Sequence, residues 1–252
     1  MDTPVPIGRR AAPERCELEV ERFPQPDDVT CGPTCLMQVY RYYEDSRPFT
    51  EILEATPRNP DGGTLAVYLG ISALKSGYRA TLYPFDLRVF DPSWFDLGVR
   101  DLCDKLRARK ECSSKVRLRT SIEAWIQFLE AGGKVQFGEL SPELLVEILD
   151  RGHPILSGLS ATWLYRQTRE RPDDNEADDL RGDPAGHFVV VCGYSAGGKR
   201  FMVRDPSSHV PFSRNGRYVV PAQRLINAIL LGDVTQDAVL LELSPERGRK
   251  RR

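Results

Sequence analysis

The sequence predicts an α+β fold in which an N-terminal helix packs on a mainly antiparallel sheet. Apolar residues recur at helical spacing through most of the first half of the chain. In the second half, short runs of branched and aromatic residues alternate with glycine-containing turns, which is typical of antiparallel strands. The chain has 252 residues, of which 40% are hydrophobic, and this is enough for one sizeable core.

Each predicted helix has apolar positions three and four residues apart. The helices are expected at about 32–43, 50–55, 65–76, 93–108, 121–131, 142–151 and 222–231. Pro33 falls in the first turn of the first helix, a position that proline favours. The strands are expected at about 80–83, 134–137, 154–159, 188–194, 200–204 and 238–243. Helices therefore come first, and the sheet is built mainly from the second half.

A single domain is expected at 15–243. The segment 1–14 is rich in proline and arginine and is expected to be disordered, and 244–252 ends as a basic tail. Two stretches are interpreted as additions to a minimal core, namely a charged helical segment at 91–112 and a polar run at 167–186. The polar run has little to bury, so it is expected to be a mobile lid or a specificity loop.

Composition excludes several functional classes. The net charge of -1 provides no global field to attract nucleic acid, so no nucleic-acid partner is expected. The first residues lack an apolar targeting segment, and no stretch approaches the roughly 18 apolar residues of a membrane helix. We therefore expect a cytoplasmic protein without membrane insertion.

The cysteines are expected to be reduced thiols, because the chain is long and lacks a secretion signal. The six are Cys16, Cys31, Cys35, Cys103, Cys112 and Cys192. A zinc site would draw on Cys31 and Cys35 with Cys192 or His187, but the remaining ligands show no tight paired spacing. Neither a metal nor an organic cofactor is expected.

Cys31 is the candidate nucleophile because it stands at the start of the first predicted helix. There the unpaired backbone N–H groups and the positive end of the helix dipole favour a thiolate over a thiol. Gln25 lies six positions upstream, far enough to fold back and donate a side-chain N–H to the oxygen that becomes negative during attack. The backbone N–H of Cys31 would be the second donor. Cys35, one helical turn later, is expected to pack in the core.

His187 and Asp205 are the candidate base and its orienting carboxylate. The strands 188–194 and 200–204 flank a glycine-containing turn, which predicts a hairpin centred on position 196 with His187 facing Asp205. Opposed residues on one face have Cβ atoms about 4.5–5.5 Å apart, close enough for Asp205 to orient the imidazole. A thiol, an imidazole, a carboxylate and an amide donor together indicate a cysteine hydrolase.

Each of these residues also has a purely structural interpretation. His187 opens an apolar run and would by itself be read as a hydrogen-bonded core histidine. Asp205, followed by proline, would by itself be read as the end of a strand. Trp163 and Tyr165 are candidates either for lining a cleft or for the core. The combination with Cys31 favours the catalytic interpretation.

Three motifs in this order resemble a known family. They are Gln25-x5-Cys31-Gly-x-x-Cys35-Leu-Met, Gly186-His187-Phe-Val-Val-Val and Asp205-Pro206. They look like the bacteriocin-processing peptidases that cut after double-glycine leader signals, a papain-like cysteine peptidase family. The resemblance covers roughly 23–243 with gaps, and it is to stand-alone, C39-like members more than to transporter-fused ones. The chain departs from the family's pattern at Thr30, just before Cys31, where members commonly carry an acidic residue or a similar polar group.

The resemblance implies a papain-like fold and a role for each candidate. Cys31 would be the nucleophile, His187 the general base and then acid, Asp205 the orienting carboxylate and Gln25 the oxyanion donor. The expected reaction is hydrolysis of a peptide or small amide through a thioester. Two alternatives remain open. One is a papain-like transferase in which an amine resolves the acyl-enzyme, and the other is a peptide-binding module that kept the fold and lost turnover.

Overall fold

The computed structural model describes residues 14–59, 62–232 and 238–246. The expected N-terminal segment 1–14 lies outside these residues except for Glu14. Of the expected tail 244–252, only residues 244–246 are described, and Ser244 and Pro245 belong to the last strand. No helix in the described ranges is both long enough and apolar enough to cross a bilayer.

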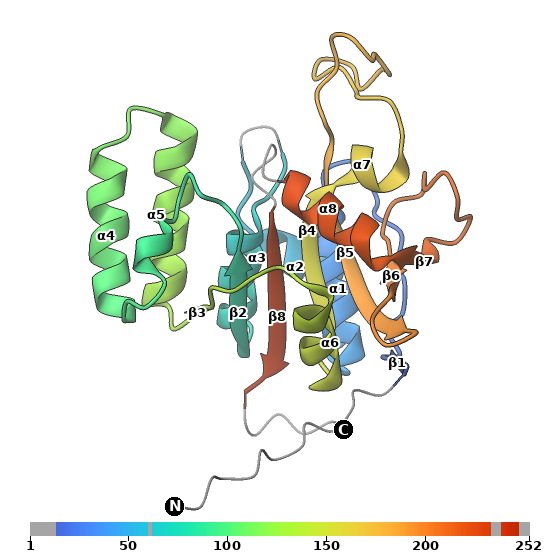
Figure 1. Ribbon diagram of the computed structural model, residues 1–252, viewed down its shortest axis with the longest axis horizontal. Coiled ribbons are helices and arrows are strands. Elements are labelled where there is room, and N and C mark those ends of the chain that lie inside the picture. Colours follow the sequence, from blue (N-terminus) through green and yellow to red (C-terminus); the bar gives the residue numbers. More distant parts are fainter. Residues whose placement is uncertain (1–13, 60–61, 233–237, 247–252) are drawn as a thin grey trace, which may run out of the picture.

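The described part of the chain forms one eight-stranded sheet (Figure 1). Its order is β3-β2-β8-β4-β5-β6-β7, with β1 paired to β5. The strands are β1 (Cys16–Glu17), β2 (Tyr78–Pro84), β3 (Lys134–Val135), β4 (Ile155–Ser160), β5 (Gly186–Ser195), β6 (Arg200–Arg204), β7 (Arg217–Pro221) and β8 (Val239–Pro245). The pair β2 and β3 is parallel and the other pairs are antiparallel. The predicted α+β class with a mainly antiparallel sheet is therefore confirmed.

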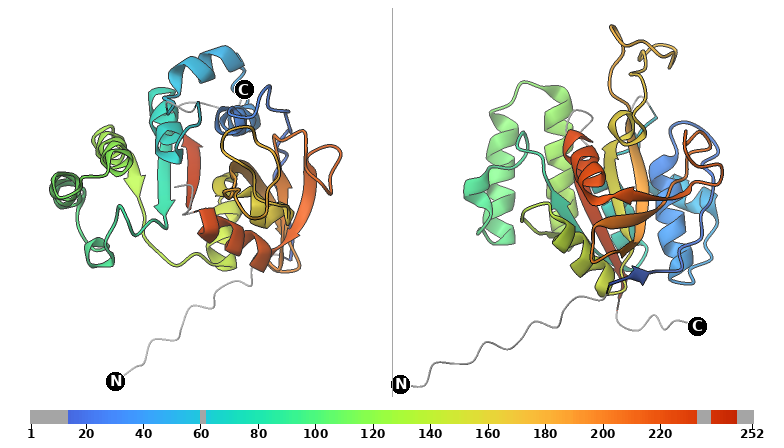
Figure 2. Two further views of the ribbon diagram at one scale, coloured as in Figure 1. Left: turned by 90° about the horizontal axis from the view of Figure 1, so that it is seen from above. Right: turned by 45° about the vertical axis from the view of Figure 1, so that its right-hand side comes forward.

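Helices cover both faces of the sheet. They are α1 (Cys31–Tyr42), α2 (Phe49–Ala55), α3 (Ala66–Lys75), the 3₁₀ turn η1 (Pro92–Trp94), α4 (Val99–Glu111), α5 (Val116–Glu130), α6 (Pro142–Asp150), α7 (Ala161–Tyr165) and α8 (Ala222–Leu231). Helices α1 to α3 lie behind the sheet in Figure 1, whereas α6 and α8 lie in front of it. The views of Figure 2 agree, and they show α4 and α5 side by side beyond the β2–β3 end.

Strand β5 separates two hydrophobic cores. Phe188, Val190 and Cys192 point into the core shared with α1 and α3. Val189 and Val191 point into the core shared with α6 and α8. Because successive side chains of a strand alternate between faces, an uninterrupted apolar run fills both cores. The strand that begins with Gly186 and His187 is therefore held firmly from both sides.

The helix predicted at 93–108 is two elements. Asp91 accepts a hydrogen bond from the backbone N–H of Ser93 at 2.9 Å and starts η1. The chain then leaves helical geometry, and α4 begins after Gly98, whose ψ of 161° is extended. Helix α5 begins at Val116, five residues before its predicted start. The charged Arg117 and Arg119 interrupt the apolar pattern in its first turn, so this turn was not recognised from the sequence. The short elements β1, β7 and α7 were not predicted.

The polar run 167–186 rises above the sheet between α7 and β5 (Figure 1). Its neck is closed by paired backbone hydrogen bonds between Glu170 and Asp183, of 3.1 and 2.8 Å. Most of the other loop residues are exposed: Leu180 is 85% accessible, and the Arg181 side chain is 75% accessible. Few apolar groups anchor this loop, which agrees with its interpretation as an addition to the core.

Trypsin under native conditions is expected to make its first cut between β1 and β8 after Arg181. The loop backbone there belongs to no helix or strand, and local opening exposes it to a protease at low free-energy cost. Mass spectrometry of a digestion time course measures the order of cleavage. Arg107, inside α4, is the matched basic site and should be cut later. First cleavage in α4 or α5 would contradict the expectation.

Candidate active site

Cys31 is the first residue of α1, as predicted, and is partly exposed. The next residue must be glycine, because a Cβ at Gly32 would lie 2.7 Å from Thr64 Cγ2 and 3.3 Å from Phe188 Cδ2. The start of α1 therefore packs directly against β5 next to His187. The first N–H groups of a helix have no intrahelical partner, so they remain available around the Cys31 side chain.

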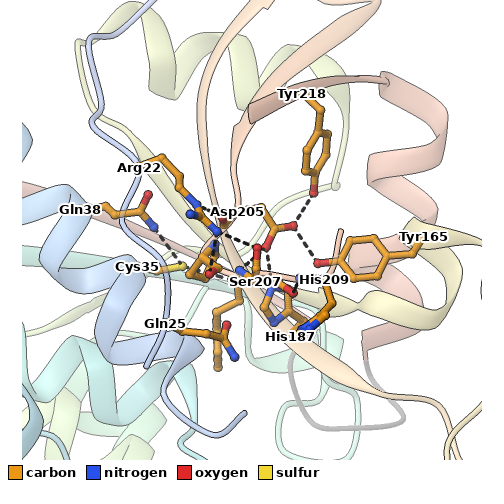
Figure 3. Close-up of polar contacts among 12 residues, drawn as sticks. Arg22, Gln25, Cys35, Gln38, Tyr165, His187, Asp205, Ser207, His209 and Tyr218 are labelled. Atoms are coloured by element: carbon orange, nitrogen blue, oxygen red, sulfur yellow. Dashed lines mark hydrogen bonds and ion pairs between the residues drawn. The ribbon is translucent and has the colours of Figure 1, made fainter. Parts of the chain in front are cut away.

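His187 and Asp205 are in direct contact (Figure 3). His187 Nε2 lies 2.9 Å from Asp205 Oδ1, and both side chains are buried, with 9% and 0% exposure. Because Nε2 is occupied, Nδ1 is the ring nitrogen that remains for the Cys31 thiol, which lies close enough to help raise the pKa of His187. The structure thus brings together the thiol, the imidazole and the carboxylate that the sequence singled out.

The ionisation of this histidine is strongly shifted. Burial by itself lowers the pKa of His187, but the Asp205 carboxylate and the Cys31 side chain outweigh burial and raise it to about 10. Burial works against the charged form of Asp205 as well, yet His187 and the hydrogen bonds to the carboxylate hold the pKa of Asp205 below its usual value. Both shifts favour an imidazolium and a carboxylate at neutral pH.

The hairpin register that predicted this contact is wrong. The prediction centred the hairpin on position 196, but the turn between β5 and β6 spans 196–199. Continuing the observed strand pairing therefore places position 207, and not Asp205, opposite His187. Asp205 is the diagonal neighbour on the same face, still within reach of a histidine. The observed pairs are Val190↔Arg204, Val191↔Val203, Gly193↔Met202, Tyr194↔Phe201 and Ser195↔Arg200.

A β-bulge between Val191 and Gly193 decides which face Asp205 occupies. In the register set by the turn, Asp205 would lie opposite Val190, whose side chain points away from the face of His187. The extra residue of β5 shifts the register by one, and Asp205 returns to the face of His187. A Cβ at Gly193 would lie 2.5 Å from the Cys16 carbonyl oxygen of β1, so only glycine allows β1 to pair here.

Two tyrosines, Tyr165 buried and Tyr218 partly buried, hold the other oxygen of Asp205. Tyr165 Oη donates to Asp205 Oδ2 at 2.8 Å, and Tyr218 Oη donates to the same oxygen at 2.7 Å. The backbone N–H of Ser207 donates to Oδ1 at 2.9 Å. Burial and the Asp205 charge raise the pKa of both phenols far above the usual tyrosine range. Both therefore stay protonated donors at every physiological pH.

Arg22 fixes the backbone of the loop that carries Asp205. Its Nε donates to the Asp205 carbonyl oxygen at 2.8 Å. Its Nη2 donates to the carbonyl oxygens of Pro206 and Ser207, at 3.1 and 2.7 Å. The guanidinium therefore positions the loop through carbonyl groups and leaves the Asp205 carboxylate to His187 and the tyrosines.

Gln25 lies beside the same loop, with its backbone N–H donating to the Pro206 carbonyl oxygen at 2.9 Å. Its side-chain Nε2 donates to the Asp27 carbonyl oxygen at 2.8 Å, and its Oε1 is buried without a partner among the described residues. An amide nitrogen carries two N–H donors, so one remains beyond the bond to Asp27. The role of Gln25 as oxyanion donor stays a prediction.

A cavity of about 250 Å³ opens beside Cys31 and His187. Its walls are residues 28–29, Asn59, residues 63–65 and Gly186–Phe188. The polar loop reaches this rim, since burial and the nearby Asp28 carboxylate raise the pKa of Glu170. Cys31 and His187 therefore line one open cleft, with the loop 167–186 beside it.

The described residues contain no group of three or more histidine, cysteine or acidic side chains placed to hold a metal ion. All six cysteines are free thiols. Cys35 is fully buried in the core, as expected, and donates to the Phe188 carbonyl oxygen at 3.2 Å.

Sequence reasoning missed the partners of Asp205. Tyr165 was a candidate for the cleft or the core, and it is a core residue that also binds the carboxylate. Trp163, on the same helix, is 46% exposed and lies outside the cavity at Cys31. Tyr218 and Arg22 carry no local signal, because their contacts with Asp205 and its loop depend on how distant elements pack.

No family model and no curated protein matches the chain. Among solved structures, the chain is similar to the peptidase domain of Streptococcus ComA, a bifunctional ABC transporter of a quorum-sensing pathway, with 15% identity, a TM-score of 0.43 and coverage of 90% of this chain and 100% of that one. It is similar to a double-glycine-motif protease of an AMS/PCAT transporter in complex with its leader peptide, with 15% identity, a TM-score of 0.44 and coverage of 92% and 95%. It is also similar to xylellain, a cysteine protease from Xylella fastidiosa, with 15% identity, a TM-score of 0.47 and coverage of 94% and 88%.

These solved structures are peptidases of the class that the sequence motifs resemble. The catalytic roles of Cys31, His187, Asp205 and Gln25 stay predictions.

Proposed function

We propose that this chain is a cysteine peptidase that hydrolyses a peptide or amide bond through a thioester on Cys31. One observation carries the proposal. A thiol at a helix start, a buried histidine whose pKa is raised to about 10, and a buried carboxylate form a continuous chain of contacts at the wall of an open cavity. A purely structural role for His187 would account for its burial, but not for the partly exposed thiol and the cavity beside it.

Attack on the substrate follows from the protonation state of the pair. The raised pKa of His187 keeps a proton on the imidazole, and in the proposed attack the Cys31 thiolate beside this imidazolium is the nucleophile. Its sulfur forms a bond to the carbonyl carbon, and the C=O electron pair moves to the oxygen. The backbone N–H of Cys31 and the second side-chain N–H of Gln25 are the proposed donors to that oxyanion.

Release of the amine and hydrolysis complete the cycle. His187 donates its proton to the nitrogen as the C–N bond breaks, which leaves the acyl group on Cys31 as a thioester. The neutral ring then takes a proton from water, and the water oxygen attacks the thioester. Cleavage of the C–S bond releases the acid and restores the thiolate and imidazolium. The proposed substrate is a peptide or a small amide, and with six free thiols we keep a reducing, cytoplasmic setting as part of the proposal.

Iodoacetamide at mildly acidic pH is expected to modify Cys31 before any other cysteine, because only the thiolate reacts and His187 favours it there. Peptide mapping by mass spectrometry measures the order. Cys112 is the matched control, since it is exposed while Cys31 is only partly exposed. First labelling of Cys112 would show that exposure governs reactivity, and the activated thiol would be refuted.

Turnover itself is tested with a peptide library and the Cys31→Ser variant as background. Products that carry a new C-terminal acid support hydrolysis. Products that incorporate an added amine would instead support the transferase. Fast Cys31 labelling without a product in either assay would support the binding module.

A further inference from the structure

We propose that Tyr165 and Tyr218 are positioning residues that hold the Asp205 carboxylate in the orientation His187 requires and keep it ionised. This inference rests on the proposed peptidase function, since the two phenols act only through Asp205. They come from different elements, α7 and β7, and converge on one atom, Asp205 Oδ2 (Figure 3).

The four donors divide between the two carboxylate oxygens. The phenols saturate Oδ2, while His187 and the Ser207 N–H occupy Oδ1. Rotation of the carboxylate about its Cβ–Cγ bond would stretch bonds from three separate elements at once. The phenols therefore keep Oδ1 directed at the imidazole.

Phenols suit this role because they are neutral. A buried carboxylate needs donors, but an arginine or lysine on Oδ2 would neutralise its charge and reduce its effect on His187. The groups that lie against Asp205 include His187, Cys35, the two phenols and Arg22, whose guanidinium binds backbone carbonyl groups of the loop. Imidazolium is the only cation on the carboxylate oxygens among the described residues.

The rings themselves are supported. Phe212 packs edge-on against both tyrosines, with ring centroids 6.0 Å from Tyr165 and 5.0 Å from Tyr218. Tyr165 also contacts the His187 ring, at 6.1 Å between centroids. Replacing a phenol with phenylalanine removes the hydroxyl and keeps this packing.

The test compares Tyr165→Phe, Tyr218→Phe and the double variant with the wild-type protein. Loss of both donors is expected to lower kcat about tenfold or more, with KM within about twofold, because the substrate does not touch the phenols. Without them the pKa of Asp205 rises, so the acid limb of the pH profile should move to higher pH. Tyr83→Phe is the matched control, since Tyr83 Oη donates at 2.6 Å to Glu242, a buried carboxylate that also contacts His153.

A double variant that loses thermal stability as Tyr83→Phe does, but keeps kcat and the acid limb, overturns the proposal. If the wild-type protein cleaves no peptide, the rate of Cys31 alkylation replaces kcat, because it depends on the same His187–Asp205 pair. If Cys31 is unreactive too, the peptidase proposal fails by itself. The role of the phenols is then decided by an NMR pH titration of the His187 ring resonances. Their acid-side inflection is expected at higher pH in the double variant than in the wild-type protein. An unchanged inflection would show that the inference is wrong.

Discussion

Replacement of His187 by alanine is expected to reduce peptide hydrolysis by roughly a factor of a thousand or more, since one side chain supplies both proton transfers. Cys31 would lose the imidazolium that stabilises its thiolate, and the departing amine would lose its proton donor. Alkylation of Cys31 at mildly acidic pH should slow in parallel. Both rates are measured on the same preparation, together with the thermal unfolding midpoint.

The chain contains a close control for this variant. His153 Nδ1 lies 2.6 Å from Glu242 Oε1, so His153→Ala also breaks a histidine–carboxylate pair. That pair lies near Ile155, at the start of β4, whereas His187 pairs with Leu159 near its end. His153→Ala should change stability and leave turnover within about twofold. Equal loss of turnover in both variants would remove His187 from the site.

Asp205→Asn is expected to lower turnover by more than about tenfold while the protein still folds, because the amide is isosteric with the carboxylate. The sign of the pH effect follows from His187. Asp205 is the main cause of its raised pKa of about 10, and burial, which acts in the opposite direction, remains in the variant. The imidazolium is then lost at lower pH, so the alkaline limb of kcat/KM should shift downward.

Rates measured from pH 5 to 11 on wild type and Asp205→Asn locate that limb. Glu242→Gln is the control, because Glu242 is a buried carboxylate outside the cleft. Burial acts to raise its pKa, but hydrogen bonds with His153 and Arg151, among others, outweigh burial and lower the pKa to about 2. An alkaline limb at the same pH in Asp205→Asn and wild type would show that Asp205 does not set the ionisation of His187.

The features that the sequence predicted well are local. The start of α1 at Cys31 follows from Pro33 and the apolar spacing after it, and the ends of α3, α6 and α8 follow from the same periodicity. The central strands were recognisable as apolar runs because both of their faces are buried. Elements of two to five residues, such as β1 and α7, leave too short a pattern, and only tertiary packing specifies them.

The candidate site was predictable as a set of residues but not as a geometry. His187 and Asp205 do meet, yet by a diagonal contact that the assumed turn did not contain. A bulge depends on which residue of two strands is left unpaired, and this is decided by the neighbouring strand rather than by the turn. The contacts of Tyr165 and Tyr218 with Asp205 could not be predicted from local sequence either, since the two tyrosines lie 40 and 13 residues from Asp205 along the chain.

The bulge in β5 makes the two arms of the hairpin unequal in their tolerance to changes of length. Deleting Cys192 would erase the bulge, and the pairing of Val191 with Val203 and beyond would be unchanged, so Asp205 would keep its side of the sheet. Deleting Met202 from the opposite arm would turn Asp205 towards the α1 side unless a second irregularity formed. Homologues whose β5 strand is one residue shorter and pairs without a bulge are thus expected to keep the carboxylate in the same place. Homologues that lack one residue in β6 are expected to orient the histidine with a different group.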